Sequence, residues 1–189
     1  EARFDRIGRA ATRLVQLTDN CLADARLASH DLHVERQQTA LLTVINMAAS
    51  VVAISHDHYL NIRQHGAVES PQLQADAGLL CIAIANLLDN AVKYSAPGTV
   101  RVALKKTGHD KCALSVATPG EPLSPEECKN VFKRFYRADR ARAMDHSYGL
   151  GLSIAESIVS EHGGKIRCEG KADGNVFTVT LPTVKGETK

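Results

Sequence analysis

Three polar residues at helical spacing are the part of this sequence best suited to chemistry. Asn86, Asn90 and Lys93 stand at i, i+4 and i+7, so on a helix they lie one above another on a single face. Asparagine is a poor residue for a helix interior because its side chain competes for backbone hydrogen bonds. An amide oxygen can coordinate Mg²⁺ and an ammonium can bind phosphate, so this face predicts a polar ligand. A solvated helix face would show the same spacing, and the spacing alone does not exclude it.

A glycine-containing run is the second candidate. Gly149-Leu150-Gly151-Leu152 lies at the start of a helix predicted over Leu150–His162. Glycines there let backbone N–H groups approach an anion at the positive end of the helix dipole, although a tight hinge loop is the alternative. The preceding residues 129–142 carry six basic side chains against Asp139 alone, which predicts a mobile lid facing phosphate rather than a solvated face. The six are Lys129, Lys133, Arg134, Arg137, Arg140 and Arg142.

The helix that carries the asparagines is predicted from Asp76, as the N-cap residue, to about Ser95. The breakers Ala96-Pro97-Gly98 end it. Its core stripe lies about 130° from the asparagine face at the helical rotation of ~100° per residue. The stripe consists of Leu80, Ile84, Leu87 and Ala91.

The remaining patterns predict an α+β fold with helices on one face of a sheet. Ser124-Pro125-Glu126-Glu127 satisfies the capping-box pattern and opens a helix through about Phe132. Residues Gly66–Gln74 are expected to form a loop. Another helix is predicted at Thr39–Ile54, and strands at Asp31–Gln37, Tyr59–Gln64, Val100–Leu104, Cys112–Val116, Ile166–Glu169 and Val176–Leu181.

The first thirty residues show a heptad pattern of apolar positions. A helix of this length must bury its apolar stripe, so a helical bundle or a dimer is expected, with packing on its own domain as the alternative. The stripe consists of Phe4, Ile7, Ala11, Leu14, Thr18, Cys21 and Ala25.

The composition of the chain excludes several classes of protein. The chain has 189 residues, of which 44% are hydrophobic and 23% charged, as in ordinary globular proteins. A net charge of +2 gives no global electrostatic case for binding nucleic acid. There is no run of about 18 uncharged apolar residues of the kind that spans a membrane. The five cysteines are odd in number and lack a C-x-x-C pair, so reduced thiols are expected rather than a disulfide framework or a zinc site.

Three ordered motifs resemble those of sensor histidine kinases. Residues 86–95 (NLLDNAVKYS) resemble the N box, residues 132–137 (FKRFYR) the F box, and residues 149–154 (GLGLSI) the G2 box. The segments 158–164 (IVSEHGG) and 174–177 (GNVF) are also typical of that family. The resemblance implies a Bergerat-type ATP-binding α/β sandwich over residues 30–189. Residues 1–29 would be the second helix of a dimerisation hairpin.

The resemblance also implies a set of site residues. Asn90 would coordinate Mg²⁺, Asn86 would line the phosphate site, and Lys93 and Tyr94 would contact phosphate and nucleotide. Residues 149–152 would cover the phosphates. Thr118 stands where the family's G1 box usually has an aspartate, which accepts a hydrogen bond from the adenine amino group. In this chain a hydroxyl therefore replaces a charged acceptor. The full expected nucleotide set is Asn86, Asn90, Lys93, Tyr94, Thr118, Gly120, Arg137, Gly149, Leu150, Gly151 and Leu152, with Asn86 and Lys93 as catalytic residues.

The implied activity is that of a protein-histidine kinase that uses ATP and Mg²⁺. The family's phosphoacceptor histidine lies in an H-E/D-x-x-T/N-P motif, and none of the eight histidines here fits it, so the acceptor is expected upstream of Glu1. A response regulator as partner, a homodimer, and a cytoplasmic position in a bacterial inner-membrane sensor are also implied. The alternative is a degenerate nucleotide-binding or dimerisation module without kinase activity.

Overall fold

The computed structural model describes residues 34–52, 58–65, 70–108, 110–138 and 148–184. It also describes Gly8, Leu14, Thr18, Leu22 and Ala25. The chain divides into two compact units, Glu1–His33 and Val34–Lys189. In the first unit the five described residues are all helical, and the Thr18 hydroxyl donates to the Leu14 carbonyl at 2.9 Å. The rest of the helix predicted there lies outside the described residues.

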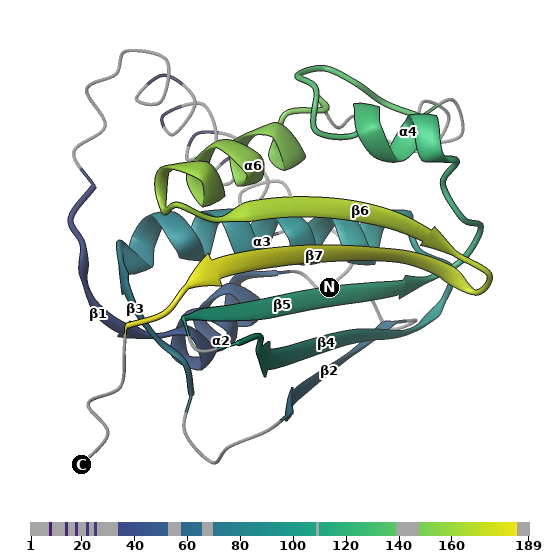
Figure 1. Ribbon diagram of the computed structural model, residues 1–189. Helices are drawn as coiled ribbons and strands as arrows, with labels where there is room; N and C mark the ends of the chain where they lie inside the picture. Colours follow the sequence, from purple (N-terminus) through teal and green to yellow (C-terminus); the bar gives the residue numbers. More distant parts are fainter. Residues whose placement is uncertain are drawn as a thin grey trace. The chain divides into compact units, whose positions relative to one another are not determined.

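A five-stranded sheet forms one layer of the second unit, with strand order β2-β4-β5-β7-β6 (Figure 1). β2 runs parallel to β4, and the other neighbouring strands are antiparallel. A separate two-stranded sheet pairs β1 with β3. The bounds are β1 Gln37–Ala40, β2 His58–His65, β3 Gln72–Ala75, β4 Gly98–Lys106, β5 Lys111–Pro119, β6 Lys165–Lys171 and β7 Gly174–Pro182.

Three helices form the second layer, on one face of the five-stranded sheet (Figure 1). They are α2 (Leu41–Val51), α3 (Ala77–Tyr94) and α6 (Gly151–Glu161), and the short helix α4 (Pro125–Asn130) lies against β6. The core fills the space between the layers, with alternate residues of β4, β5 and β7 facing the helices. On the strands it includes Val100, Val102, Leu104, Leu114, Val116, Phe177, Val179 and Leu181.

Helix α3 is the central element of the helical layer. It packs against α2, α6 and β5, and its predicted stripe of Leu80, Ile84, Leu87 and Ala91 is buried, with at most 2% of each residue exposed. Among the described residues it is the one helix long and apolar enough to cross a membrane by length and composition alone. Here that apolar side is the inner face of a globular core.

Most predicted elements are confirmed, including the β4–β5 hairpin and the capping box of α4. In that box Glu127 N–H donates to Ser124 Oγ at 3.2 Å, and Ser124 N–H donates to Glu127 Oε2 at 2.7 Å. The Asp76 N-cap is also confirmed, because its Oδ1 accepts from Leu79 N–H at 3.0 Å.

Several predicted boundaries were wrong, most of them near the two-stranded sheet. The first strand spans Gln37–Ala40 rather than Asp31–Gln37, so α2 begins at Leu41 and not at Thr39. Helix α2 also ends at Val51, because Val52 is extended, and not at Ile54. The expected loop over Gly66–Gln74 contains the start of β3. The reason is tertiary: β1 and β3 pair with each other from Gln37 opposite Ala75, which the local pattern of neither segment reveals.

A buried histidine joins the start of α3 to the end of α6. The backbone N–H of Asp76 donates to His162 Nε2 at 3.0 Å, and His162 Nδ1 lies 2.8 Å from the Ile158 carbonyl. Since Nε2 accepts, the tautomer that satisfies both bonds has its proton on Nδ1, and 5% of the residue is exposed. Nearby, Glu35 N–H donates to Asp76 Oδ2 at 3.3 Å, and the Arg36 guanidinium donates to the Glu161 carbonyl at 2.7 Å.

Replacing His162 tests how much this junction stabilises the fold. In H162L the Asp76 N–H loses its acceptor inside the protein, so we expect the free energy of unfolding to fall by about 1–3 kcal/mol in urea denaturation. Ser160→Ala, at an exposed position of the same helix, is the control and should change it by less than about 0.5 kcal/mol. Equal stability of the two variants would show that the junction is dispensable.

Candidate functional site

The polar face of α3 meets the beginning of α6 at one close contact. A Cβ added to Gly151 would lie 2.8 Å from Asn86 Oδ1, so the asparagine side chain occupies the space beside this glycine. Gly151 is the first residue of α6, and Leu150 before it supplies no side-chain cap. The first N–H groups of a helix have no partner within the helix, and an anion can bind them. Asn86 is therefore beside a backbone that can bind an anion.

The register between α3 and α6 is set at two points. One is the Asp76–His162 hydrogen bond, and the other is the contact between Asn86 and Gly151. The helices run antiparallel between these points, over ten residues of α3 and eleven of α6. At ~1.5 Å rise per residue these lengths match, about 15–16 Å each.

The segment after α4 is hydrogen-bonded to Gly149, two residues before the start of α6. Phe135 N–H donates to the Gly149 carbonyl at 2.9 Å. Gly149 has φ +68°, and a Cβ there would lie 2.8 Å from the Tyr136 carbonyl oxygen, so only glycine fits. Phe135 itself has φ +62°, an uncommon conformation for a residue other than glycine. The Phe132 ring anchors the segment in the core through an edge-to-face contact with Phe177, with ring centroids 6.4 Å apart.

The end of β5 lies next to the end of α3. Ala96 N–H donates to the Pro119 carbonyl at 3.0 Å. Gly120 has φ +137°, and a Cβ added there would lie 3.4 Å from the Ala96 nitrogen. Thr118 is 8% exposed and lies on the helix-facing side of β5, with Leu114 and Val116. The expected G1-like residues are therefore placed at the carboxyl end of the helix that carries the asparagines.

Thr118 has a hydrogen-bond partner within the sheet. Its hydroxyl donates to the Asn175 carbonyl at 3.3 Å, which leaves the hydroxyl oxygen able to accept a bond from a ligand. The Asn175 side chain holds the following loop, because its Oδ1 accepts from Leu123 N–H at 2.7 Å and its Nδ2 donates to the Glu121 carbonyl at 3.0 Å. Sequence reasoning missed this role of Asn175, since Asn175 is more than fifty residues from Glu121 and Leu123 in the chain.

Lys93 also has a partner that sequence reasoning missed. Its ammonium lies 2.7 Å from Asp89 Oδ2, and the two side chains are 27% and 23% exposed. The i, i+4 spacing of an acid and a base on one helix was a readable signal for this pair. A phosphate that binds Lys93 would compete with the carboxylate of Asp89.

The other predicted site residues lie on the same elements. Asn90 and Tyr94 are half-buried on α3, and Leu150 and Leu152 are half-buried around the start of α6. Arg137 is half-buried two residues after Phe135. The structure thus brings together the α3 face, the α6 start and the β5 end, whereas the expected lid residues Arg140 and Arg142 lie outside the described residues.

The donor set near Asn86 and Asn90 fits a hard cation bound together with phosphate. Within the described ranges, no cluster of three His, Cys, Asp or Glu side chains could hold a metal ion by itself. Mg²⁺ keeps several waters and binds through a few protein oxygens plus substrate phosphates, so amide oxygens are sufficient protein ligands.

Residues 75–185 match the family described as histidine kinase-, DNA gyrase B- and HSP90-like ATPase. The match covers more than half of the chain, and the chain belongs to this ATPase family. The expected Bergerat-type fold and the resemblance to the catalytic ATP-binding domain of sensor histidine kinases are confirmed.

The similar proteins are histidine kinases. Over 117 residues the chain is 43% identical to the signal transduction histidine-protein kinase/phosphatase MprB of Mycobacterium avium (strain 104), a match covering 59% of this chain and 22% of that protein. The solved structure of a mycobacterial sensor histidine kinase MprB has a TM-score of 0.68 at 27% identity, covering 79% of this chain and 99% of that one. The histidine kinase ThkA, solved in complex with the response regulator protein TrrA, shares the fold with a TM-score of 0.67 at 19% identity, covering 92% and 50%. The chain spans about a fifth of the length of the curated relative.

Gly151→Ala tests the contact between Asn86 and α6. The new methyl group would displace the Asn86 amide, whose Oδ1 lies at 2.8 Å, while alanine suits a helix, so we expect a folded protein whose ATP affinity is lower by about tenfold. Isothermal titration measures the affinity. Gly78→Ala is the matched control, because Gly78 is exposed in the first turn of α3 and an added Cβ there meets only Asp76 Oδ1 at 3.4 Å. The same affinity in both variants would mean that Asn86 does not contact the ligand.

Proposed function

We propose that the second unit binds Mg·ATP and transfers the γ-phosphoryl group to a histidine of the family's H-E/D-x-x-T/N-P motif, which this sequence does not contain. The observation that carries the proposal is the position of Asn86 beside the first residue of α6. This contact puts a polar amide beside the first N–H groups of a helix, where phosphate oxygens can bind. Membership of the ATPase family supports ATP as the ligand.

Phosphoryl transfer needs mainly positioning and neutralisation of charge. The N–H groups at the start of α6 would bind the phosphates, with Asn86 beside them. The Lys93 ammonium would leave the Asp89 carboxylate and bind a phosphate oxygen instead. Both partners are anionic, so a phosphate can replace the carboxylate. Asn90 would hold Mg²⁺, which when bound neutralises phosphate charge.

Adenine would bind near the end of β5. Thr118 offers a hydroxyl oxygen as a neutral acceptor, and Gly120 keeps the turn close to the end of α3. A neutral hydrogen bond contributes about 1 kcal/mol net, against about 1.5–3 for a charged partner, so recognition of adenine is weaker than with an aspartate.

The chemistry of Asn86 favours transfer over hydrolysis. Related ATPases of this fold carry a glutamate at the corresponding position, where it activates water. An amide does not act as a base, so Asn86 can orient a phosphate but cannot take a proton from water.

The remaining parts of the proposal concern the whole protein. A response regulator would receive the phosphoryl group from the acceptor histidine. The helix expected over residues 1–29 would belong to a dimerisation hairpin, and the exposed Leu14 and Leu22 side chains are consistent with packing against further helices. The chain would lie in the cytoplasmic part of a bacterial inner-membrane sensor.

Asn90→Ala tests the metal assignment. We expect the fold to persist, because Asn90 lies off the apolar stripe, while the gain in ATP affinity that Mg²⁺ gives the unaltered chain is lost. Titrations with and without Mg²⁺ measure this gain. Lys106→Gln is the control, since Lys106 is exposed at the far end of β4 from Gly98 and the α3 terminus. If Asn90→Ala keeps the full Mg²⁺ effect, another residue holds the ion.

Incubation with radiolabelled ATP tests the acceptor. We expect ATP to bind but no acid-labile phosphate to appear on the chain, because none of its eight histidines has the acceptor motif. A second polypeptide carrying the family's acceptor motif should become labelled when mixed with it. Label on a histidine of this chain would contradict the assignment. Absence of ATP binding at millimolar concentration would favour a module without kinase activity.

A further inference from the structure

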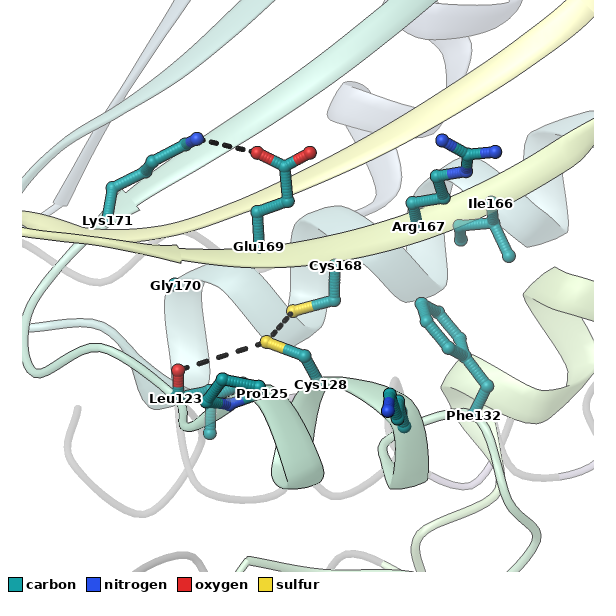
Figure 2. Close-up of a pocket in the computed structure, with 11 residues that line it drawn as sticks. Leu123, Pro125, Cys128, Phe132, Ile166, Arg167, Cys168, Glu169, Gly170 and Lys171 are labelled. Atoms are coloured by element: carbon teal, nitrogen blue, oxygen red, sulfur yellow. Dashed lines mark hydrogen bonds and ion pairs between the residues drawn. The ribbon is translucent and has the colours of Figure 1, made fainter.

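Two cysteines that are far apart in the sequence meet in the folded chain. Cys128 on α4 and Cys168 on β6 have their sulfur atoms 3.3 Å apart (Figure 2). Figure 2 shows Cys168 pointing from β6 towards α4, whereas Glu169 and Lys171 point to the other side of the strand, where they form an ion pair of 2.6 Å. The other two described cysteines, Cys81 and Cys112, lie on α3 and β5.

The packing of α4 on β6 holds these sulfurs in place. A Cβ at Gly170 would overlap the Leu123 carbonyl oxygen, so the strand and the chain entering α4 are in close backbone contact. The Ser124 capping box fixes the direction in which α4 begins, and Phe132 beyond α4 is anchored on Phe177. Contacts at both ends of α4 therefore hold Cys128 opposite Cys168.

We propose that Cys128 and Cys168 form a dithiol modification site that a two-electron oxidant such as hydrogen peroxide converts into an intramolecular disulfide. One of the two thiols gives up its proton and the thiolate attacks a peroxide oxygen. The O–O bond breaks, a sulfenic acid forms, and the leaving hydroxide takes up a proton as water. The other cysteine, as its thiolate, then attacks the oxidised sulfur, the S–O bond breaks, and the hydroxide leaves as a second water once it is protonated, while the S–S bond forms. Two electrons and two protons pass from the thiols to the peroxide, and a dithiol reductant reverses the change.

The geometry needs only a small movement. A disulfide bond is about 2.05 Å long, so the sulfurs must approach each other by about 1.3 Å from their separation of 3.3 Å. A rotation of the two side chains can supply this, because both already point into the same space.

The surroundings of Cys168 affect how readily it ionises. Burial, and after it the neighbouring Cys128, raise the pKa of the Cys168 thiol. The thiolate form of Cys168 is therefore disfavoured. Because a thiolate is the nucleophile in each step, we expect the reaction to become faster as the pH rises.

Both cysteines line a hollow, and Cys168 is the more exposed of the two. The hollow has a volume of about 580 Å³ and includes Cys128, Cys168, Phe132, Lys129 and Arg167 in its lining (Figure 2). Cys112 contrasts with this pair: it is completely buried, its Sγ lies 3.7 Å from the Leu181 carbonyl, and burial raises its pKa to about 11. Peroxide should therefore spare Cys112.

The modification would act on the segment next to the candidate site. α4 continues into residues 131–138, and within them Phe135 donates to the Gly149 carbonyl. A disulfide that ties α4 to β6 would restrain this segment. Disulfide formation needs no nucleotide, so its test is independent of the proposed kinase function.

The test treats the reduced full chain with hydrogen peroxide and digests it with trypsin without reductant. We expect fragment 112–129 joined to fragment 168–171, with fragmentation placing the link at Cys128 and two hydrogen atoms lost. Dithiothreitol should abolish the link. Cys81→Ser, at a half-buried position of α3, is the control and should retain it. Cys128→Ser and Cys168→Ser should each lose it, and the cysteine that remains of the pair should instead gain one oxygen atom.

Two results would overturn the proposal: a link that persists in Cys128→Ser, or disulfides that form only between chains. Amide hydrogen exchange of residues 131–138 should slow in the oxidised protein relative to the reduced one. If amide exchange of these residues is unchanged, the disulfide does not restrain this segment. A lower urea midpoint after oxidation would show that the folded geometry does not accommodate the bond, because an unstrained cross-link between residues 128 and 168 should raise the midpoint.

Discussion

The hydrogen bond from the Asp76 backbone to His162 joins the beginning of one core helix to the end of another. Because α3 and α6 are antiparallel, fixing this end also fixes which residues meet at the other, and there Asn86 lies beside Gly151. A slip of one helix by a single residue would move that contact by about 1.5 Å and rotate it by ~100°. The buried histidine, remote from the candidate site, therefore helps to position it.

The candidate site is assembled around α3 from segments that lie far apart in the chain. Its middle contacts the start of α6, its last turn carries the Lys93–Asp89 pair, and its end contacts the turn after β5. These contacts need glycine at 149 and 151, where a Cβ would meet other atoms at 2.8 Å. The site therefore depends on glycines, which leave room for these contacts, as well as on polar side chains.

The short helix α4 connects this site to a second chemical feature. On one side Cys128 faces Cys168, and on the other the chain continues to Phe135 and its hydrogen bond with Gly149. A covalent change at the sulfurs and a ligand at the start of α6 would thus act on two ends of one segment. Its left-handed residue, Phe135, shows that tertiary contacts already hold this segment in an uncommon backbone conformation.

Features that depend on neighbours within a few residues could be predicted from the sequence alone. The Asp76 cap, the Ser124 capping box, the β4–β5 hairpin and the buried stripe of α3 were all readable, because caps, turns and periodicity act locally. Three motifs also indicated the ATPase family. The β1–β3 pairing, the His162 and Asn175 hydrogen bonds and the Cys128–Cys168 contact depend on the tertiary structure. Each of these joins segments more than thirty residues apart, and only the packing of the core brings such segments within bonding distance.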